Sequence, residues 1–363
     1  MSETSRWAAP RRALVVVPRR LGDVLLATPV MRSLKRAYPD CRVDALVFAG
    51  TEAILGGNPD VNAVLTIAER PTPGDHLALV RRLLRRYDLA LSLVPGDRST
   101  FYAWCAGRKS AGLVVDEPKH AWKKALLGRW VPFDDRGTHT VAMHLRLIEA
   151  LGIPPVPEVV ASWRPANAEA ASAALAAQGV TGAYAVLHPF PKFRYKQWPA
   201  EHWVAVADWL RAQGLAVVLT GGPDPAERAC CAEIAQHAAV ANLAGALSLP
   251  ATACVIAGAR VYAGPDTATT HLAAALGVPT AALFGPTDPL KWGPWPHSHR
   301  TLENPWRRVG SQRLGNVAIV QGAATCTPCL LEGCDRHVDS TADCLTGLPP
   351  QAMIAALQTL LAP

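Results

Sequence analysis

Short apolar runs alternate with amphipathic stretches along most of the chain. The run Ala13–Val17 is continuous and rich in valine, which predicts a buried strand. Leu26, Val30 and Leu34 then recur at helical spacing with basic residues between them, which predicts a helix. Pro29 either kinks this helix or marks its first turn. Successive strand–helix units of this kind predict an α/β fold, with a parallel sheet and helices on its faces.

The alternation continues in two blocks, separated by a proline-rich stretch. Further strands are expected at 41–47, 61–67, 89–94, 184–187, 215–220, 261–265 and 280–284, and further helices at 76–87, 140–151, 199–213, 225–237, 249–258 and 350–361. Pro154–Pro165 is extended and lacks periodicity, as linkers do. We therefore expect two domains, 1–164 and 165–363, that face each other across a cleft.

Composition narrows the class of protein. No run in the 363 residues approaches the ~20 apolar residues of a membrane span, so a cytoplasmic protein is expected. A net charge of +7 favours an anionic partner. Nucleic acid is disfavoured, because its binding predicts a basic stripe with exposed aromatic side chains, whereas the cations here gather at strand ends.

The stretch Asp266–His271 lies between an apolar strand and a helix. Asp and Thr side chains can cap the first N–H groups of that helix, and its dipole favours an anion. An ordinary capped βαβ unit explains the pattern equally well. His271 is either a core histidine bonded to a carbonyl or a contact to phosphate.

Three cations follow the strand at 184–187 within five residues: Lys192, Arg194 and Lys196. Packing does not readily explain them, and they suit a diphosphate held together with the Asp266 helix. No Gly-x-Gly-x-x-Gly follows any predicted strand, which disfavours a dinucleotide-dependent dehydrogenase.

Asp23 follows Arg19 and Arg20 at the carboxyl end of the first strand. A carboxylate next to arginines is expected to stay ionised, so it can accept a proton. The helix-capping interpretation of Asp23 is equally good and does not exclude the first.

The segment Lys119–Trp130 mixes basic residues with two tryptophans. Such a segment suits an acidic lipid headgroup or an anionic acceptor, with Lys123 and Lys124 as contacts. The alternative is a solvated helix with its tryptophans packed inward.

Four of the nine cysteines cluster near the end of the chain, at Cys326, Cys329, Cys334 and Cys344. A Cys-x-x-Cys pair with two further thiols is compatible with a structural zinc ion. A buried, reduced cluster is an equal alternative.

Several of these stretches together resemble glycosyltransferase family 9, the bacterial ADP-heptose:lipopolysaccharide heptosyltransferases. Pro18–Pro29 resembles the amino-terminal signature of the family, His188–Trp198 its donor loop, Gly264–Thr280 its nucleotide-sugar motif and Phe284–Asp288 the loop that follows. The similarity covers nearly the whole chain in order, and it is greatest to the heptosyltransferase III branch.

The resemblance implies a GT-B fold of two Rossmann-like domains, with the acceptor on the amino-terminal side and the donor on the carboxyl-terminal side. It implies metal-independent, inverting transfer of heptose from ADP-heptose to the lipopolysaccharide core at the cytoplasmic face of the inner membrane, without a cofactor. Asp23 matches the general base of the family, and Lys196, assisted by Lys192, matches the lysine that steadies the leaving diphosphate. Asp266, Thr267, Ala268 and His271 match its phosphate-contacting helix start. Asp224 and Glu227 are candidates for the ribose or adenine, and Arg19, Arg20, Lys123 and Lys124 for the acceptor.

Overall fold

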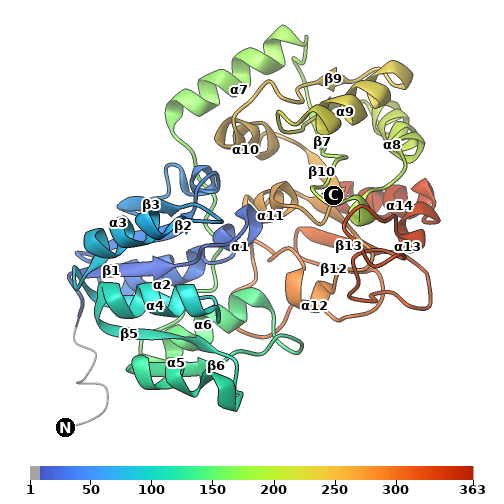
Figure 1. Ribbon diagram of the computed structural model, residues 1–363. Helices are drawn as coiled ribbons and strands as arrows, with labels where there is room; N and C mark the ends of the chain where they lie inside the picture. The colour runs from blue at the N-terminus through green and yellow to red at the C-terminus, as the bar shows by residue number, and fades with distance from the viewer. Residues whose placement is uncertain (1–8, 363) are drawn as a thin grey trace. The chain divides into compact units, whose positions relative to one another are not determined.

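A computed structural model describes residues 9–362 (Figure 1). The chain forms two compact units that divide between Ser162 and Trp163, except that Arg300–Glu303 group with the first unit. Each unit has its own sheet and core, and each is described by itself below. In the described range, no helix is both long and apolar enough to cross a membrane.

The first unit is built on a six-stranded parallel sheet in the order β3-β2-β1-β4-β5-β6. The central strand β1 is buried over four of its five residues, as its continuous apolar run predicts. The strands are β1 (Arg12–Val16), β2 (Arg42–Phe48), β3 (Ala63–Ile67), β4 (Tyr87–Ser92), β5 (Gly107–Val114) and β6 (Arg129–Pro132).

Helices cover this sheet, and their buried side chains explain their placement. Leu79 and Leu83 of one helix and Tyr102 of the next pack against β1 residues Leu14 and Val16 in a single cluster. The helices are α1 (Leu21–Leu25), α2 (Thr28–Ala37), α3 (Pro73–Leu83), α4 (Asp97–Ala106), α5 (Ala121–Leu126) and α6 (Thr140–Ala150), with short 3₁₀ turns η2 (Glu52–Leu55) and η3 (Pro118–His120).

Several features of this unit differ from the sequence expectation. The helix expected around Leu26–Leu34 is replaced by two helices, the short α1 and then α2. Pro29 lies in the first turn of α2, where its missing N–H costs nothing. Helix α4 and the following strand β5 were not predicted, because their mixed polar and aromatic residues lack a clear period.

The second unit contains a seven-stranded sheet in the order β12-β13-β11-β10-β7-β8-β9, parallel except for the edge strand β12. The strands are β7 (Tyr184–Leu187), β8 (Ala216–Leu219), β9 (Ala241–Asn242), β10 (Val261–Pro265), β11 (Thr280–Phe284), β12 (Gln312–Leu314) and β13 (Val317–Gln321). Apart from β12, its strands follow the same spatial order as those of the first unit.

Two layers of helices enclose the second sheet. One core gathers Trp203, Ile234 and Leu357 from three helices, and the opposite core gathers Ala171, Ile256 and Ala273. The helices are α7 (Pro165–Ala177), α8 (Ala200–Ala212), α9 (Pro225–His237), α10 (Leu249–Ala257), α11 (Ala268–Ala275), α12 (Pro289–Trp292), α13 (Asp343–Thr346) and α14 (Pro350–Leu361), with the 3₁₀ turn η4 (Arg194–Lys196).

The strand order fixes where chemistry can gather. In each sheet the strand order reverses at one central pair of neighbouring strands, which is β1 and β4 in the first unit and β7 and β10 in the second. Apart from β12, the strands that follow each member of the pair in sequence lie progressively farther out on that member's side. Open α/β sheets bind ligands beside the carboxyl ends of such a pair. The loops that follow these four strands are therefore the places to look for a site.

Candidate functional site

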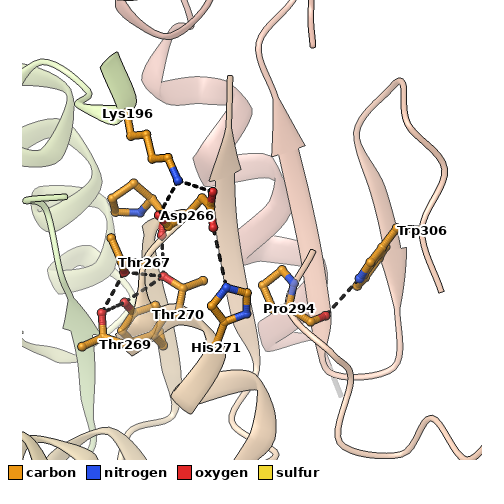
Figure 2. A network of polar contacts seen from close by, with 10 residues as sticks. Lys196, Asp266, Thr267, Thr269, Thr270, His271, Pro294 and Trp306 are labelled. Carbon is orange, nitrogen blue, oxygen red and sulfur yellow. Dashed lines mark hydrogen bonds and ion pairs between the residues drawn. The ribbon is translucent and has the colours of Figure 1, made fainter. Parts of the chain in front are cut away.

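The loops after β7 and β10 bring Lys196 and Asp266 together, although 70 residues separate them in sequence (Figure 2). Lys196 Nζ lies 2.6 Å from Asp266 Oδ2 and 3.5 Å from the Asp266 carbonyl oxygen. On the other side of the carboxylate, His271 Nε2 lies 3.6 Å from Oδ1. One buried carboxylate therefore holds both a lysine and a histidine.

Charge balance keeps this carboxylate ionised. Burial alone would raise the pKa of Asp266, but the Lys196 ammonium and the His271 side chain outweigh burial and hold it well below its usual range. The second ring nitrogen of His271, Nδ1, is buried without a hydrogen-bond partner among the described residues. His271 thus faces a carboxylate rather than a carbonyl of the core.

A hydroxyl network supports the start of α11. Thr267 Oγ1 lies 2.9 Å from Thr269 Oγ1 and 3.2 Å from Thr270 Oγ1, and both of the latter contact the buried Tyr262 hydroxyl. Thr267 is the N-cap residue of α11, but its side chain accepts no capping hydrogen bond. Asp266, turned toward Lys196, does not cap the helix either, so the capping expected from the sequence is wrong here.

The remaining cations of the loop after β7 are arranged differently from Lys196. Lys192 and Arg194 are exposed, and Lys192 Nζ lies 6.0 Å from the Phe193 ring centroid. His188 at the end of β7 is buried with its Nδ1 3.1 Å from Thr220 Oγ1, and burial lowers its pKa to about 4. His188 is therefore a neutral hydrogen-bonding group at this edge.

The two carboxylates considered for the ribose or adenine lie after β8. Asp224 is the exposed N-cap of α9, and its Oδ1 accepts a hydrogen bond from the Ala226 N–H at 2.9 Å. Glu227 accepts from the Gly222 N–H, and burial raises its pKa against the lowering effect of that bond. Both carboxylates already have backbone partners, and Glu227 is the one that lies against the strand-end glycines.

Asp23 lies in the first turn of α1, after β1, with a side chain 14% exposed. Arg19 Nε is 3.4 Å from its Oδ1, which keeps a positive charge beside the carboxylate. Arg20, the other cation of this loop, is exposed. His144, which the sequence analysis did not single out, is buried close to Asp23. Burial lowers its pKa to about 4, despite the nearby Asp23 charge.

The two lysines expected to bind the acceptor are engaged within the first unit. Lys123 is only 1% exposed, and its Nζ contacts the Pro95 carbonyl oxygen and Asp97 Oδ1, each at 2.6 Å. Lys124 pairs with Asp116, and its Nζ lies 4.5 Å from the Trp130 ring centroid. Lys123 therefore fixes the loop after β4 and is not accessible to an acceptor, which corrects the expectation from the sequence.

The cysteine cluster is mostly open to solvent. Cys326 and Cys334 are exposed and Cys344 is buried, and every one of the four thiols is free. Within residues 9–362, no group of three or more His, Cys, Asp or Glu side chains is arranged to hold a metal ion. A buried thiol cluster is therefore wrong, and the zinc hypothesis has no preformed site to support it.

The sequence family model that matches this chain is glycosyltransferase family 9 (heptosyltransferase), over residues 76–313. The chain belongs to that family. Lipopolysaccharide heptosyltransferase 3 of Escherichia coli is 33% identical over 290 residues, covering 76% of this chain and 83% of the relative. Lipopolysaccharide heptosyltransferase 1 of Pseudomonas aeruginosa is 29% identical and covers 96% of this chain and 98% of the relative. This family-9 heptosyltransferase is thus a glycosyltransferase, as its motifs predicted.

The fold of the heptosyltransferase matches solved family members. Its similarity to E. coli heptosyltransferase WaaC with ADP has a TM-score of 0.71 at 22% identity, covering 96% of this chain and 99% of the other. Two parallel sheets and this likeness confirm the predicted GT-B fold. The roles assigned to Asp23, Lys196, Asp266 and the other site residues stay predictions.

Proposed function

We propose that the protein transfers heptose from ADP-heptose to the inner core of lipopolysaccharide, with inversion at the anomeric carbon and without a metal. The observation that carries the proposal is the Lys196–Asp266–His271 cluster at the carboxyl ends of β7 and β10, where an open α/β sheet offers its ligand site. A family relative 26% identical was solved with ADP-2-deoxy-2-fluoro heptose, which supports this donor.

In the proposed reaction the second unit holds the donor. Lys196 stabilises negative charge on the departing diphosphate, and the exposed Lys192 assists it. The N–H groups at the start of α11, beginning at Ala268, add donors that no side-chain cap occupies. These cationic and N–H groups supply the charge stabilisation that a metal ion would otherwise provide, which supports transfer without a metal.

The first unit supplies the proton acceptor. Asp23 takes the proton from the acceptor hydroxyl as that oxygen attacks the anomeric carbon, and ADP leaves from the opposite side. Arg19 at 3.4 Å orients one carboxylate oxygen. Since the loop that contains Arg19, Arg20 and Asp23 carries more positive than negative charge, it suits the anionic core of lipopolysaccharide. Reaction with this acceptor would take place at the cytoplasmic face of the inner membrane.

The test is incubation of the purified protein with ADP-heptose and a series of truncated core acceptors, read by mass spectrometry. A mass increase of one heptose on one acceptor, together with ADP release, is expected. The anomeric configuration of the product, read by NMR, tests inversion, and an unchanged rate in chelator tests metal independence. Transfer from another ADP-sugar in preference to ADP-heptose would redefine the donor, and donor binding without product would indicate a non-catalytic nucleotide-sugar-binding protein.

A further inference from the structure

The large exposed apolar side chains in the described part of the first unit lie on, or directly after, three helices. Within its described residues they are Leu77 and Leu84 at α3, Phe101 on α4 and Trp122 on α5, with exposed fractions of 40–56%. Helix α3 packs against α4, and α4 against α5, so the three helices form a continuous layer (Figure 1). Soluble surfaces rarely gather apolar side chains in this way without a partner.

Positive charge is concentrated in the same segment. Residues 73–130 contain eleven Lys and Arg against five Asp and Glu, a net charge of +6 in a chain whose total is +7. The segment that exposes apolar side chains therefore holds nearly all of the net charge of the protein.

The acidic groups of this segment are all engaged. Asp75 belongs to the capping box of α3, and Asp88 accepts hydrogen bonds from the backbone N–H groups of β1 and the residue before it. The other three pair with lysines, in the ion pairs Lys123–Asp97, Lys124–Asp116 and Lys119–Glu117. The carboxylates of this segment that form ion pairs therefore pair with lysines and not with the arginines of α3.

The α3 arginines lie beside the exposed leucines. Leu79 and Leu83 face the core, so Leu77 and Arg81 lie on the opposite, outward side of the helix. Arg82 is exposed at the flank of the same helix. Among the described residues, neither Arg81 nor Arg82 forms an ion pair.

The same surface continues from α3 onto α4. The guanidinium of Arg85, just after α3, lies 5.6 Å from the Trp104 ring centroid, and Trp104 lies 6.0 Å from Phe101. Arg85, Trp104 and Phe101 therefore connect the outward side of α3 with that of α4.

We propose that this α3–α5 surface, made of Leu77, Arg81, Arg82, Leu84, Phe101, Trp104 and Trp122, docks on an anionic lipid bilayer. Unpaired arginines attract acidic headgroups, and leucine and aromatic side chains insert at the boundary between headgroups and acyl chains. The surface differs from the one suggested by the sequence of Lys119–Trp130, because Lys123 and Lys124 are already paired. It rests on no assumption about the donor or the reaction.

Co-sedimentation of the full chain with vesicles tests the proposal. Vesicles of phosphatidylcholine mixed with phosphatidylglycerol should bind the protein, and vesicles of phosphatidylcholine alone should bind it far less. Raising the salt concentration should weaken binding, because headgroup attraction is screened. Arg81→Gln with Arg82→Gln should lower partitioning about 25-fold, since each basic residue near such a surface contributes about fivefold.

A second variant tests the apolar part, and a third is the matched control. Leu84→Ser with Phe101→Ser should lower partitioning at least about tenfold while the melting temperature stays that of the parent. Arg307→Gln with Val309→Ser, which changes an exposed pair in the second unit, should bind as the parent does. Equal binding to neutral and anionic vesicles, or an equal loss in the control, would overturn the proposal. So would self-association that disappears in the Leu84→Ser/Phe101→Ser variant without loss of lipid binding.

Discussion

The two sheets share one strand order but equip their central loops differently. After β7 and β10 a lysine, a carboxylate and a histidine form a buried cluster, with Asp266 at 7% side-chain exposure. After β1, Arg19 Nε lies 3.4 Å from Asp23 Oδ1, and the Arg19 side chain is 49% exposed. The strand order thus determines where the two candidate sites lie, and the residues of the loops determine the chemistry available at each site. A preformed cluster suits tight binding, whereas a lightly held carboxylate suits proton transfer to a group that must approach it.

The largest effect should come from Asp23. Asp23→Asn removes the proton acceptor while preserving shape, so kcat should fall about 10²–10⁴-fold with donor affinity nearly unchanged. Rates come from ADP release and affinity from calorimetry with ADP. Asp40→Asn, at an exposed turn of the same unit, should change neither. Retained turnover in the Asp23 variant would remove Asp23 as the base.

A change at Lys196 tests the buried cluster of the second unit, through both protein stability and donor binding. Lys196→Met leaves Asp266 buried without its cation, so the free energy of unfolding should fall by up to about 3 kcal/mol. Donor affinity should fall about 10–100-fold. Urea denaturation of this variant, of Asp266→Asn and of the double variant gives the coupling energy.

The exposed Lys192 is the matched control for Lys196. Lys192→Met should change stability by less than about 0.5 kcal/mol. If both lysine variants behave alike in stability and donor affinity, the buried pair has no special role.

The pH dependence of stability should report the Asp266 cluster. Since the pKa of Asp266 is lower in the folded than in the unfolded chain, the carboxylate stabilises the fold above the unfolded value of 3.8. That contribution is lost as the pH falls below 3.8 toward the folded pKa. The stability difference between the parent and Asp266→Asn should therefore be constant near neutral pH and shrink in acid. A difference that does not change with pH would argue against an ionised Asp266.

The smallest effect is expected at the hydroxyl network under α11. Tyr262→Phe removes the hydroxyl that contacts Thr269 and Thr270, at a cost of about 1 kcal/mol in thermal or urea unfolding. Tyr38→Phe, at the half-buried residue that ends α2, should cost less. Equal stability of the Tyr262→Phe variant and the parent would mean that the threonines satisfy one another without the tyrosine.

The sequence was informative where local pattern decides structure. Short apolar runs located β1, β7 and β10, and the motifs around Asp23, Lys196 and Asp266 identified the family. It was uninformative where partners are distant in sequence. The burial of Lys123 depends on Pro95, in the loop after β4, and on Asp97, the first residue of α4, and nothing near residue 123 signals those contacts.

The same limit applies within the candidate site. Lys196 and Asp266 were each predicted to lie at a strand end, but their 2.6 Å contact requires β7 and β10 to be neighbours, which the sheet order determines. The capping expected of Asp266 failed for the same reason, because a lysine 70 residues away competes for the carboxylate.

In the proposed donor site, the Lys196–Asp266 ion pair makes diphosphate binding an exchange of partners. The ammonium is already neutralised before any diphosphate arrives, so a phosphate oxygen must share Lys196 with the carboxylate or displace it. Attraction to the ligand is then partly offset by what the carboxylate gives up. The affinity for ADP should consequently depend on ionic strength less steeply than three cations in the donor loop would suggest.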